Sequence, residues 1–252
     1  MGVKIGGQVE KVNGKELSYS EFVEKYLVKN QPVVLTGLMD DWRACKDWVT
    51  HNGCPNLQFF STHFGESKVQ VADCGTREFT DQKRVEMSVS EFVKHWLDNS
   101  TKEISDSSTS EANGMSVLYL KDWHFVKTAI GVNLLYGILD GFTPVIDVCR
   151  KAKVLMSYHL KNGLVSLKDM EDIVLRSWTP LHADVFRSYS WSANVCGKKK
   201  WIFLPPSQCH LVFDRNLKNC VYDIFEDVSE TNFPGFKKVG HHSRSSTCIC
   251  NF

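Results

Sequence analysis

The sequence predicts a domain of mixed α and β structure in which strands dominate. In the first 125 residues, short apolar runs ended by Gly or polar residues alternate with segments of helical spacing. Strand-like residues then return at Trp178 and continue to Pro205. With 252 residues and 42% hydrophobic content, the chain can build the core of one large domain or two small ones.

Three segments carry the apolar spacing of helices. In Ser18–Val28, apolar side chains fall at positions 19, 22, 23, 26 and 27, and Ser20 is the expected N-cap. Asn56–Phe64 and Ser88–Leu97 are the other two expected helices. Asn99–Gly114 is rich in Ser, Thr, Asn and charged residues, which predicts an exposed loop.

Three further segments of this half read as strands, namely Pro32–Gly37, Lys68–Cys74 and Val117–Leu120. Lys127–Arg176 resists assignment, because Gly, Pro and Asp interrupt each apolar pattern. Val239–Phe252 is small, polar and rich in Cys, and we expect it to form a tail.

The charge balance argues against nucleic acid and membrane partners. The chain carries 30 basic and 29 acidic residues, so no long-range field favours a polyanion. The most apolar window, Ile130–Cys149, contains Asp140, Pro144 and Asp147 and makes a poor membrane span. The nine cysteines form no CxxC pair, and the first ten residues lack the apolar core of a signal peptide. We therefore expect reduced thiols and a cytoplasmic location, with the nucleus as a second compartment.

A His and an Asp one residue apart stand out in Thr179–Pro206. On a strand, residues i and i+2 point to the same face, so His182 and Asp184 can reach one ion. A second His would complete the 2-His-1-carboxylate triad of non-haem Fe(II) oxygenases, which leaves coordination positions open. A simple His–Asp hydrogen bond at a strand end is the plainer interpretation, and the HxD spacing alone favours it.

The next two segments bear on this choice. Ser188–Cys196 reads as a strand with one small polar face, which either meets solvent or lines a wet barrel cavity. After Gly197, the side chains of Lys199, Trp201 and Phe203 share a face of the following strand. A lysine that points inward among aromatic residues needs an anionic partner; otherwise the three lysines form a solvated turn.

These motifs together resemble the jumonji-C (JmjC) family, cupin-type oxygenases that depend on Fe(II), 2-oxoglutarate and O₂. The resemblance rests on TPLHADVF, SWSANVCGKKKWIFLPP, QPVVLTGLMDDW, KVQVADCG and LYLKDWHF, and it covers residues 17–126 and 177–238. It is strongest to the small jumonji lysyl hydroxylases that modify a translation release factor. It implies a double-stranded β-helix, the cupin jelly roll, with flanking N-terminal helices.

The resemblance also divides the chain and assigns roles. Residues 1–126 match the first part of the domain and 177–238 its core, whereas 127–176 is atypical and 239–252 lies outside the family pattern. His182 and Asp184 match the iron ligands. The positions implied for 2-oxoglutarate are Thr179, Lys199, Tyr119, Ser192 and Asn194, of which Tyr119 is equally well explained as a core tyrosine.

One departure affects the expected activity. The family's second iron-binding His lies in a strand resembling VPSGWHHQV, which this sequence lacks. His241 and His242 lack the apolar strand context and follow Asp184 too closely, so we do not expect them to be ligands. We expect a barrel that is incomplete at its C-terminal side, as in a truncated or alternatively spliced product, and an impaired site.

The expected function is therefore Fe(II)- and 2-oxoglutarate-dependent hydroxylation of a protein side chain, most plausibly a lysine of a translation release factor. Two alternatives stay open: an inactive JmjC-like binding protein or splice variant, and a cupin that binds Zn or Ni without redox chemistry. Histone demethylation is disfavoured, because the sequence shows no basic reader module and no metal-finger spacing.

Overall fold

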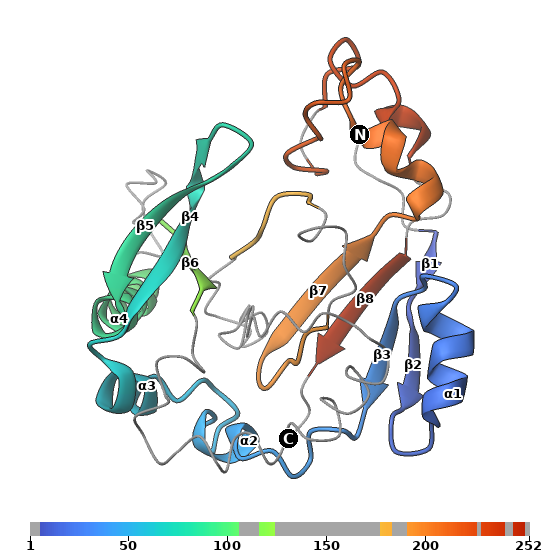
Figure 1. Cartoon of the computed structure of the whole chain (residues 1–252). Helices are drawn as coiled ribbons and strands as arrows, with labels where there is room; N and C mark the ends of the chain where they lie inside the picture. The colour runs from blue at the N-terminus through green and yellow to red at the C-terminus, as the bar shows by residue number, and fades with distance from the viewer. Residues whose placement is uncertain are drawn as a thin grey trace.

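The computed structural model describes residues 6–105, 116–123, 177–182, 191–225, 228–239 and 244–249. Within these ranges, the strands form three small sheets, and helices lie on the outer sides of two of them (Figure 1). This agrees with the predicted mixed class with many strands and few helices.

The first sheet has the strand order β5-β4-β6 and is antiparallel throughout. Its strands are β4 (Lys68–Glu78), β5 (Asp81–Ser88) and β6 (Leu118–Asp122). Strands β4 and β6 confirm the predicted strands at 68–74 and 117–120, and β4 runs longer than predicted.

Strand β5 was not predicted from the sequence, for two reasons. Its sequence DQKRVEMS is mostly polar, and the hairpin loop is Phe79–Thr80 rather than a Gly or Asn pair. Phe79 adopts a positive φ of 54°, which is unusual for a bulky side chain, and the backbone carbonyl of Phe79 accepts a hydrogen bond from Arg77.

Two helices pack on this sheet. They are α3 (Leu57–Phe64) and α4 (Val89–Ser105), while the short α2 (Ala44–Asp47) precedes them. Asn56 caps α3 as its side chain accepts from the Phe59 amide, and Ser88 and Glu91 form the reciprocal bonds of a capping box at α4. The aromatic core between helices and sheet is formed by Trp42, Trp48, Phe60, Phe64, Phe92, Trp96 and Trp123.

The loop predicted for Asn99–Gly114 is wrong in its first part, because α4 continues to Ser105. Polar side chains sustain the helix there through local bonds: Ser100 donates to the Trp96 carbonyl, and the Asn99 amide lies 3.0 Å from His95 Nε2. Residues 106–115 lie outside the described part of the chain.

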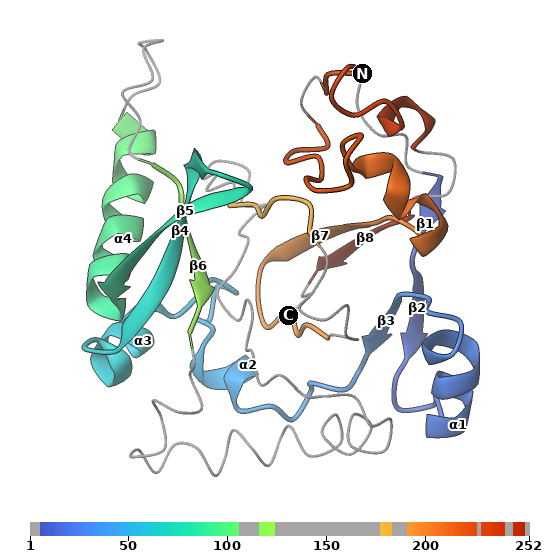
Figure 2. The same ribbon diagram turned by 45° about the horizontal axis from the view of Figure 1, so that its top comes forward.

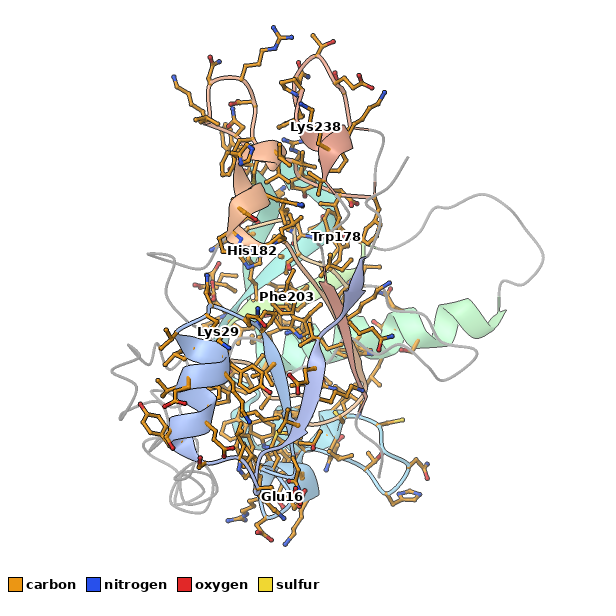
Figure 3. All side chains as sticks on the ribbon, turned by 90° about the vertical axis from the view of Figure 1, so that its right-hand side faces the viewer. Glu16, Lys29, Trp178, His182, Phe203 and Lys238 are labelled. Carbon is orange, nitrogen blue, oxygen red and sulfur yellow. The ribbon has the colours of Figure 1, made fainter. Side chains whose placement is uncertain are left out.

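A parallel pair joins β2 (Glu10–Asn13) to β3 (Val33–Thr36), the latter confirming the strand predicted at 32–37. Between them lie α1 (Tyr19–Phe22) and the π-helical turn η1 (Val23–Leu27), which pack beside this pair (Figure 2). The predicted helix is thus confirmed, but its N-cap is Ser18 rather than Ser20, because Ser18 completes a capping box with Glu21.

The third sheet has the order β1-β8-β7. Strand β7 (Lys198–Phe203) pairs antiparallel with β8 (Arg244–Ile249), and β8 pairs in parallel with the two-residue β1 (Gly7–Gln8). Strand β8 falls inside the segment 239–252 that the sequence predicts as a tail. The prediction failed because alternating small residues such as RSSTCI carry little hydrophobic signal, and backbone pairing on both edges stabilises the strand instead.

A compact cap follows β7. It contains the 3-10 turns η3 (Pro206–Val212) and η4 (Phe236–Lys238), and it has its own apolar cluster around Val212, Val221 and Phe236. Figures 1 and 2 both place this cap beyond the end of β7, away from α2 and α3.

One sequence expectation is met only in part by the described residues around the HxD motif. Residues 178–182 and 191–197 are irregular, so the continuous strand pattern predicted from Trp178 to Pro205 is confirmed only at 198–203. The segment 127–176, for which no prediction was made, lies outside the described residues. No helix in the described ranges is long and apolar enough to cross a membrane.

Candidate functional site

The segment that leads into the HxD motif, residues 177–182, runs between the β5-β4-β6 sheet and β7 in both views of the ribbon (Figures 1 and 2). Side chains from the sheet hold its start: the Trp178 carbonyl accepts from Gln82 Nε2 at 2.9 Å and from Cys74 Sγ at 3.7 Å. The cap holds its end, since the Leu181 amide donates to the Tyr222 carbonyl at 3.1 Å and Cys220 Sγ lies 3.3 Å from the Leu181 carbonyl. Both sides of the molecule therefore fix the backbone just before His182.

His182 is exposed, and its ring is oriented by its own backbone. Nδ1 lies 2.8 Å from the carbonyl of the buried Pro180. A carbonyl oxygen can only accept, so Nδ1 is the donor in this contact. A histidine that binds a metal through Nε2 commonly bonds a carbonyl through its other nitrogen in this way.

Asp184 lies outside the described residues, so the predicted pairing of its carboxylate with His182 stays a prediction. The strand geometry used to predict that pairing does not extend to His182, which occupies an irregular segment. Among the described residues, no group of three or more His, Cys, Asp or Glu side chains is arranged to hold a metal ion.

Lys199 occupies the position predicted for it on β7. Its Nζ lies 4.3 Å from the centre of the Trp201 ring, and the Trp201 and Phe203 rings stack at 5.8 Å with an interplanar angle of 10°. The shared face predicted for these three side chains is therefore confirmed. The Lys199 ammonium nitrogen is shielded from solvent, whereas Lys200 is exposed, so the lysines are not one solvated patch.

The segment between the motif and β7 does not form the predicted polar-faced strand. Val195 and Cys196 are both buried in the aromatic core, and the Asn194 amide donates to the Gly197 carbonyl at 2.9 Å. Ser192 is exposed, and residues 183–190 lie outside the described part. The alternation fails because adjacent residues, rather than alternate ones, turn toward the core.

The two remaining predicted cosubstrate residues lie on different elements. Thr179 is half-buried between Trp178 and the buried Pro180. Tyr119 is buried on β6, opposite Ala72 of β4, and burial raises the pKa of its phenol well above the ordinary value. A core role explains this position of Tyr119, and its contact with a cosubstrate stays a prediction.

Sequence reasoning missed a ring of contacts beside the motif. The Trp178 and Tyr222 rings meet edge to face at 5.3 Å, and the Arg77 guanidinium lies 4.4 Å from the centre of the Tyr222 ring. Arg77 on β4 is in turn the backbone ladder partner of Gln82 on β5. Four residues on three separate segments make this ring, so no spacing in the sequence reveals it.

Comparison with curated proteins finds relatives that are named as oxygenases or as a demethylase. It is 56% identical over 247 residues to "Arginine-specific demethylase JMJ20" of Arabidopsis thaliana, which covers 95% of this chain and 51% of that protein. It is 31% identical over 237 residues to "2-oxoglutarate and iron-dependent oxygenase JMJD4" of Mus musculus, covering 90% and 50%. The same oxygenase of Danio rerio is 35% identical over 215 residues, covering 83% and 46%.

The chain is homologous to the JmjC-type oxygenases. The resemblance found in the motifs is thereby confirmed, although no family model matches the sequence. The chain spans about half the length of the curated JmjC relatives it matches. What those relatives do as whole proteins is therefore considered for this chain only as a proposal below.

The described residues fit the metal and cosubstrate that the names of these JmjC relatives imply. His182 bonds a carbonyl through Nδ1, an arrangement in which Nε2 is the nitrogen suited to a divalent transition metal. Lys199 presents a desolvated cation on an aromatic face, a place suited to a carboxylate. The structure thus offers one candidate metal donor, His182, and one solvent-shielded lysine that is a candidate for binding an anion, Lys199.

Proposed function

We propose that the chain forms part of an Fe(II)- and 2-oxoglutarate-dependent oxygenase that hydroxylates a protein side chain. One observation carries the proposal: over nearly its whole length the chain is homologous to proteins named 2-oxoglutarate and iron-dependent oxygenases. The contact of His182 Nδ1 with the Pro180 carbonyl and the shielded ammonium of Lys199 are consistent with it.

In this proposal, Nε2 of His182 and the carboxylate of Asp184 hold the iron. Lys199 pairs with the far carboxylate of 2-oxoglutarate, and Thr179 donates a hydrogen bond to 2-oxoglutarate. Tyr119, Ser192 and Asn194 remain proposed neighbours of the cosubstrate. Iron with 2-oxoglutarate and O₂ supplies the oxidising power for a C–H bond, while these residues orient the cosubstrate and leave coordination positions open.

The surrounding structure is proposed to be a double-stranded β-helix. The β1-β8-β7 sheet and the β5-β4-β6 sheet would provide strands of such a barrel, with α1, α3 and α4 outside it. The chain's small net charge supports a protein substrate rather than nucleic acid, and a cytoplasmic or nuclear location is proposed.

The substrate proposed first is a lysine side chain of a translation release factor, on the motif resemblance described above. A second candidate is demethylation of a methylated arginine, which the name of the 56% identical plant relative favours. Both begin with hydroxylation of a C–H bond. On an N-methyl group, the hydroxylated carbon then leaves as formaldehyde, whereas a hydroxylated lysine carbon is retained.

The test measures binding before turnover. Co(II) is titrated into the purified chain without and with 2-oxoglutarate, and we expect the cosubstrate to tighten Co(II) binding in the wild-type chain. His182→Ala should remove Co(II) binding, and Lys199→Ala should remove the effect of 2-oxoglutarate. Co(II) binding that is unchanged in His182→Ala would show that the imidazole is not a ligand.

Turnover then separates the substrates. The chain is incubated with Fe(II), 2-oxoglutarate, O₂ and either a release-factor peptide or a methylated arginine peptide, and succinate is measured. Mass spectrometry distinguishes gain of one oxygen atom from loss of a methyl group with formaldehyde. Metal binding that neither responds to 2-oxoglutarate nor supports succinate release would favour the alternative of a redox-inactive cupin.

A further inference from the structure

Gln82 is one of two buried polar side chains in the described part of the chain, with an exposed fraction of 1%. It lies at the start of β5, and its Nε2 donates to the Trp178 carbonyl, 96 residues further along the chain. A buried amide N–H group costs free energy unless it is bonded, so this bond favours the observed position of the Trp178 carbonyl. Gln82 thereby connects the first sheet to the segment that carries the HxD motif.

Further contacts connect Trp178 back to Gln82, so that the contacts form a closed ring. Trp178 packs edge to face against Tyr222, the Arg77 guanidinium lies on the Tyr222 ring, and Arg77 is the ladder partner of Gln82. A closed ring of contacts resists displacement more than a chain of the same contacts, because moving one member strains two neighbours. We call Gln82, Trp178, Tyr222 and Arg77 the Gln82 ring.

The backbone between the Gln82 ring and His182 is short and stiff. It contains Pro180, whose φ is fixed by its side-chain ring and whose carbonyl accepts from His182 Nδ1. Tyr222 also accepts the Leu181 amide through its carbonyl, so the same residue holds both ends of 178–181. The place of the imidazole is therefore set by where Trp178 and Tyr222 are held.

We propose that Gln82 is a positioning residue for His182. It does not touch the imidazole; it fixes the Trp178 carbonyl and, through the Gln82 ring, the orientation in which His182 presents Nε2. The inference rests on the proposed function only for the metal that His182 would bind. The positioning itself has a readout that needs no metal.

The first experiment compares two buried-amide variants. Gln82→Met keeps the volume of the side chain and removes its donor, and Asn99→Leu does the same for the other buried amide, which bonds His95 at the opposite side of the first sheet. The imidazole ¹H–¹⁵N signals of His182, assigned with His182→Ala, are recorded without metal. We expect Gln82→Met to shift and broaden these signals and Asn99→Leu to leave them unchanged, although both lower the unfolding midpoint.

Arg77→Gln provides a second variant in case Gln82→Met does not fold. Arg77 is exposed, so its loss leaves the core intact while opening the Gln82 ring. We expect the His182 signals to move in the same direction and by less. Unchanged His182 signals in Arg77→Gln and in any folded Gln82→Met protein would overturn the proposal and leave Gln82 as a structural hydrogen bond only.

The second experiment measures Co(II) affinity in the same variants. Loss of a group that orients a ligand commonly costs about 10-fold or more in metal affinity, and we expect that loss in Gln82→Met but not in Asn99→Leu. If the wild-type chain fails to bind Co(II) while the His182 signals still respond to Gln82→Met, the proposed function fails and the positioning stands. Equal loss of affinity in both variants would count against positioning.

Discussion

His182 is exposed, and this sets what its replacement should do. The imidazole buries little apolar surface, so His182→Ala should change the free energy of unfolding by no more than about 0.5 kcal/mol while Co(II) binding is lost. Calorimetric titration and thermal unfolding check the two parts. His210→Ala, which removes another exposed imidazole, should affect neither.

The second prediction for a single residue concerns Lys199. Its shielded ammonium faces Trp201, and removing it should weaken 2-oxoglutarate binding by about 1.5–3 kcal/mol, the range of a hydrogen bond to a charged group. Titration of 2-oxoglutarate in the presence of Co(II) measures the change. Lys200→Ala is the control, because that side chain is exposed, and equal losses in both variants would indicate a diffuse charge effect.

Candidate site residues could be named from the sequence, and their surroundings could not. His182 and Lys199 were predicted from the HxD spacing and the GKKKW stretch, since both lie in short local motifs, and their roles stay predictions. The Gln82 ring was not found, because Gln82 and Trp178 meet only through the tertiary fold. Local patterns predict candidate residues for the chemistry, whereas the residues that hold those candidates in place are distributed along the chain.

At the scale of elements, α3 is held to the first sheet by aromatic contacts. Phe60 is 2% exposed and lies 5.5 Å from the Trp48 ring and 6.2 Å from the Trp123 ring. Phe60→Ala should lower the free energy of unfolding by about 3–5 kcal/mol, measured by denaturant titration. Phe79→Ala, at a hairpin tip where the residue is 90% exposed, should change it by no more than about 0.5 kcal/mol.

Asp81, at the start of β5, should make the stability of the first sheet sensitive to acid. Burial alone would raise the pKa of Asp81, but hydrogen bonds from Lys121 and Arg84 outweigh burial and lower it far below the ordinary value. The carboxylate therefore stabilises the fold above its unfolded pKa of about 3.9, and this contribution is lost as the pH falls below that value. Asp81→Asn should be less stable at pH 7 and show a smaller further loss of stability on acidification, by denaturant titration at each pH.

Helices and strands with a strong apolar period were predicted well, as α3, β3 and the start of α4 show. The errors share a physical cause: in β5, β8 and the end of α4, polar residues join regular structure through backbone pairing or local side-chain bonds. Hydrophobic periodicity does not report such stabilisation. The strand expected over Ser188–Cys196 does not form in its described part, residues 191–196, for a different reason. The sequence alternates there with a period of two, but the adjacent residues Val195 and Cys196 are both buried.

At the scale of the whole molecule, β8 lies between β1 and β7 and should be essential to the third sheet. Deleting residues 239–252 removes the pairing partner of both neighbours, and exposes the edge of β7 that carries Lys199. We expect the deleted protein to associate into oligomers and to lose 2-oxoglutarate binding, by light scattering and titration. Deleting only residues 251–252, beyond β8, should leave a chain that behaves as the wild type; equal behaviour of both deletions would show that β8 is dispensable.

The pairing of Gly7 with Arg244 also affects the order in which the molecule is assembled. Residues 7 and 8 are synthesised well before their partner strand, and closing so long a loop is slow. Strand β7 likewise waits for residues 244–249 before its backbone is paired. The first sheet can form before residues 244–249 are synthesised, whereas β7, which presents Lys199, is paired only afterwards. The candidate anion site should therefore mature after the first sheet, and the nascent chain should be folded in its first half before it can bind 2-oxoglutarate.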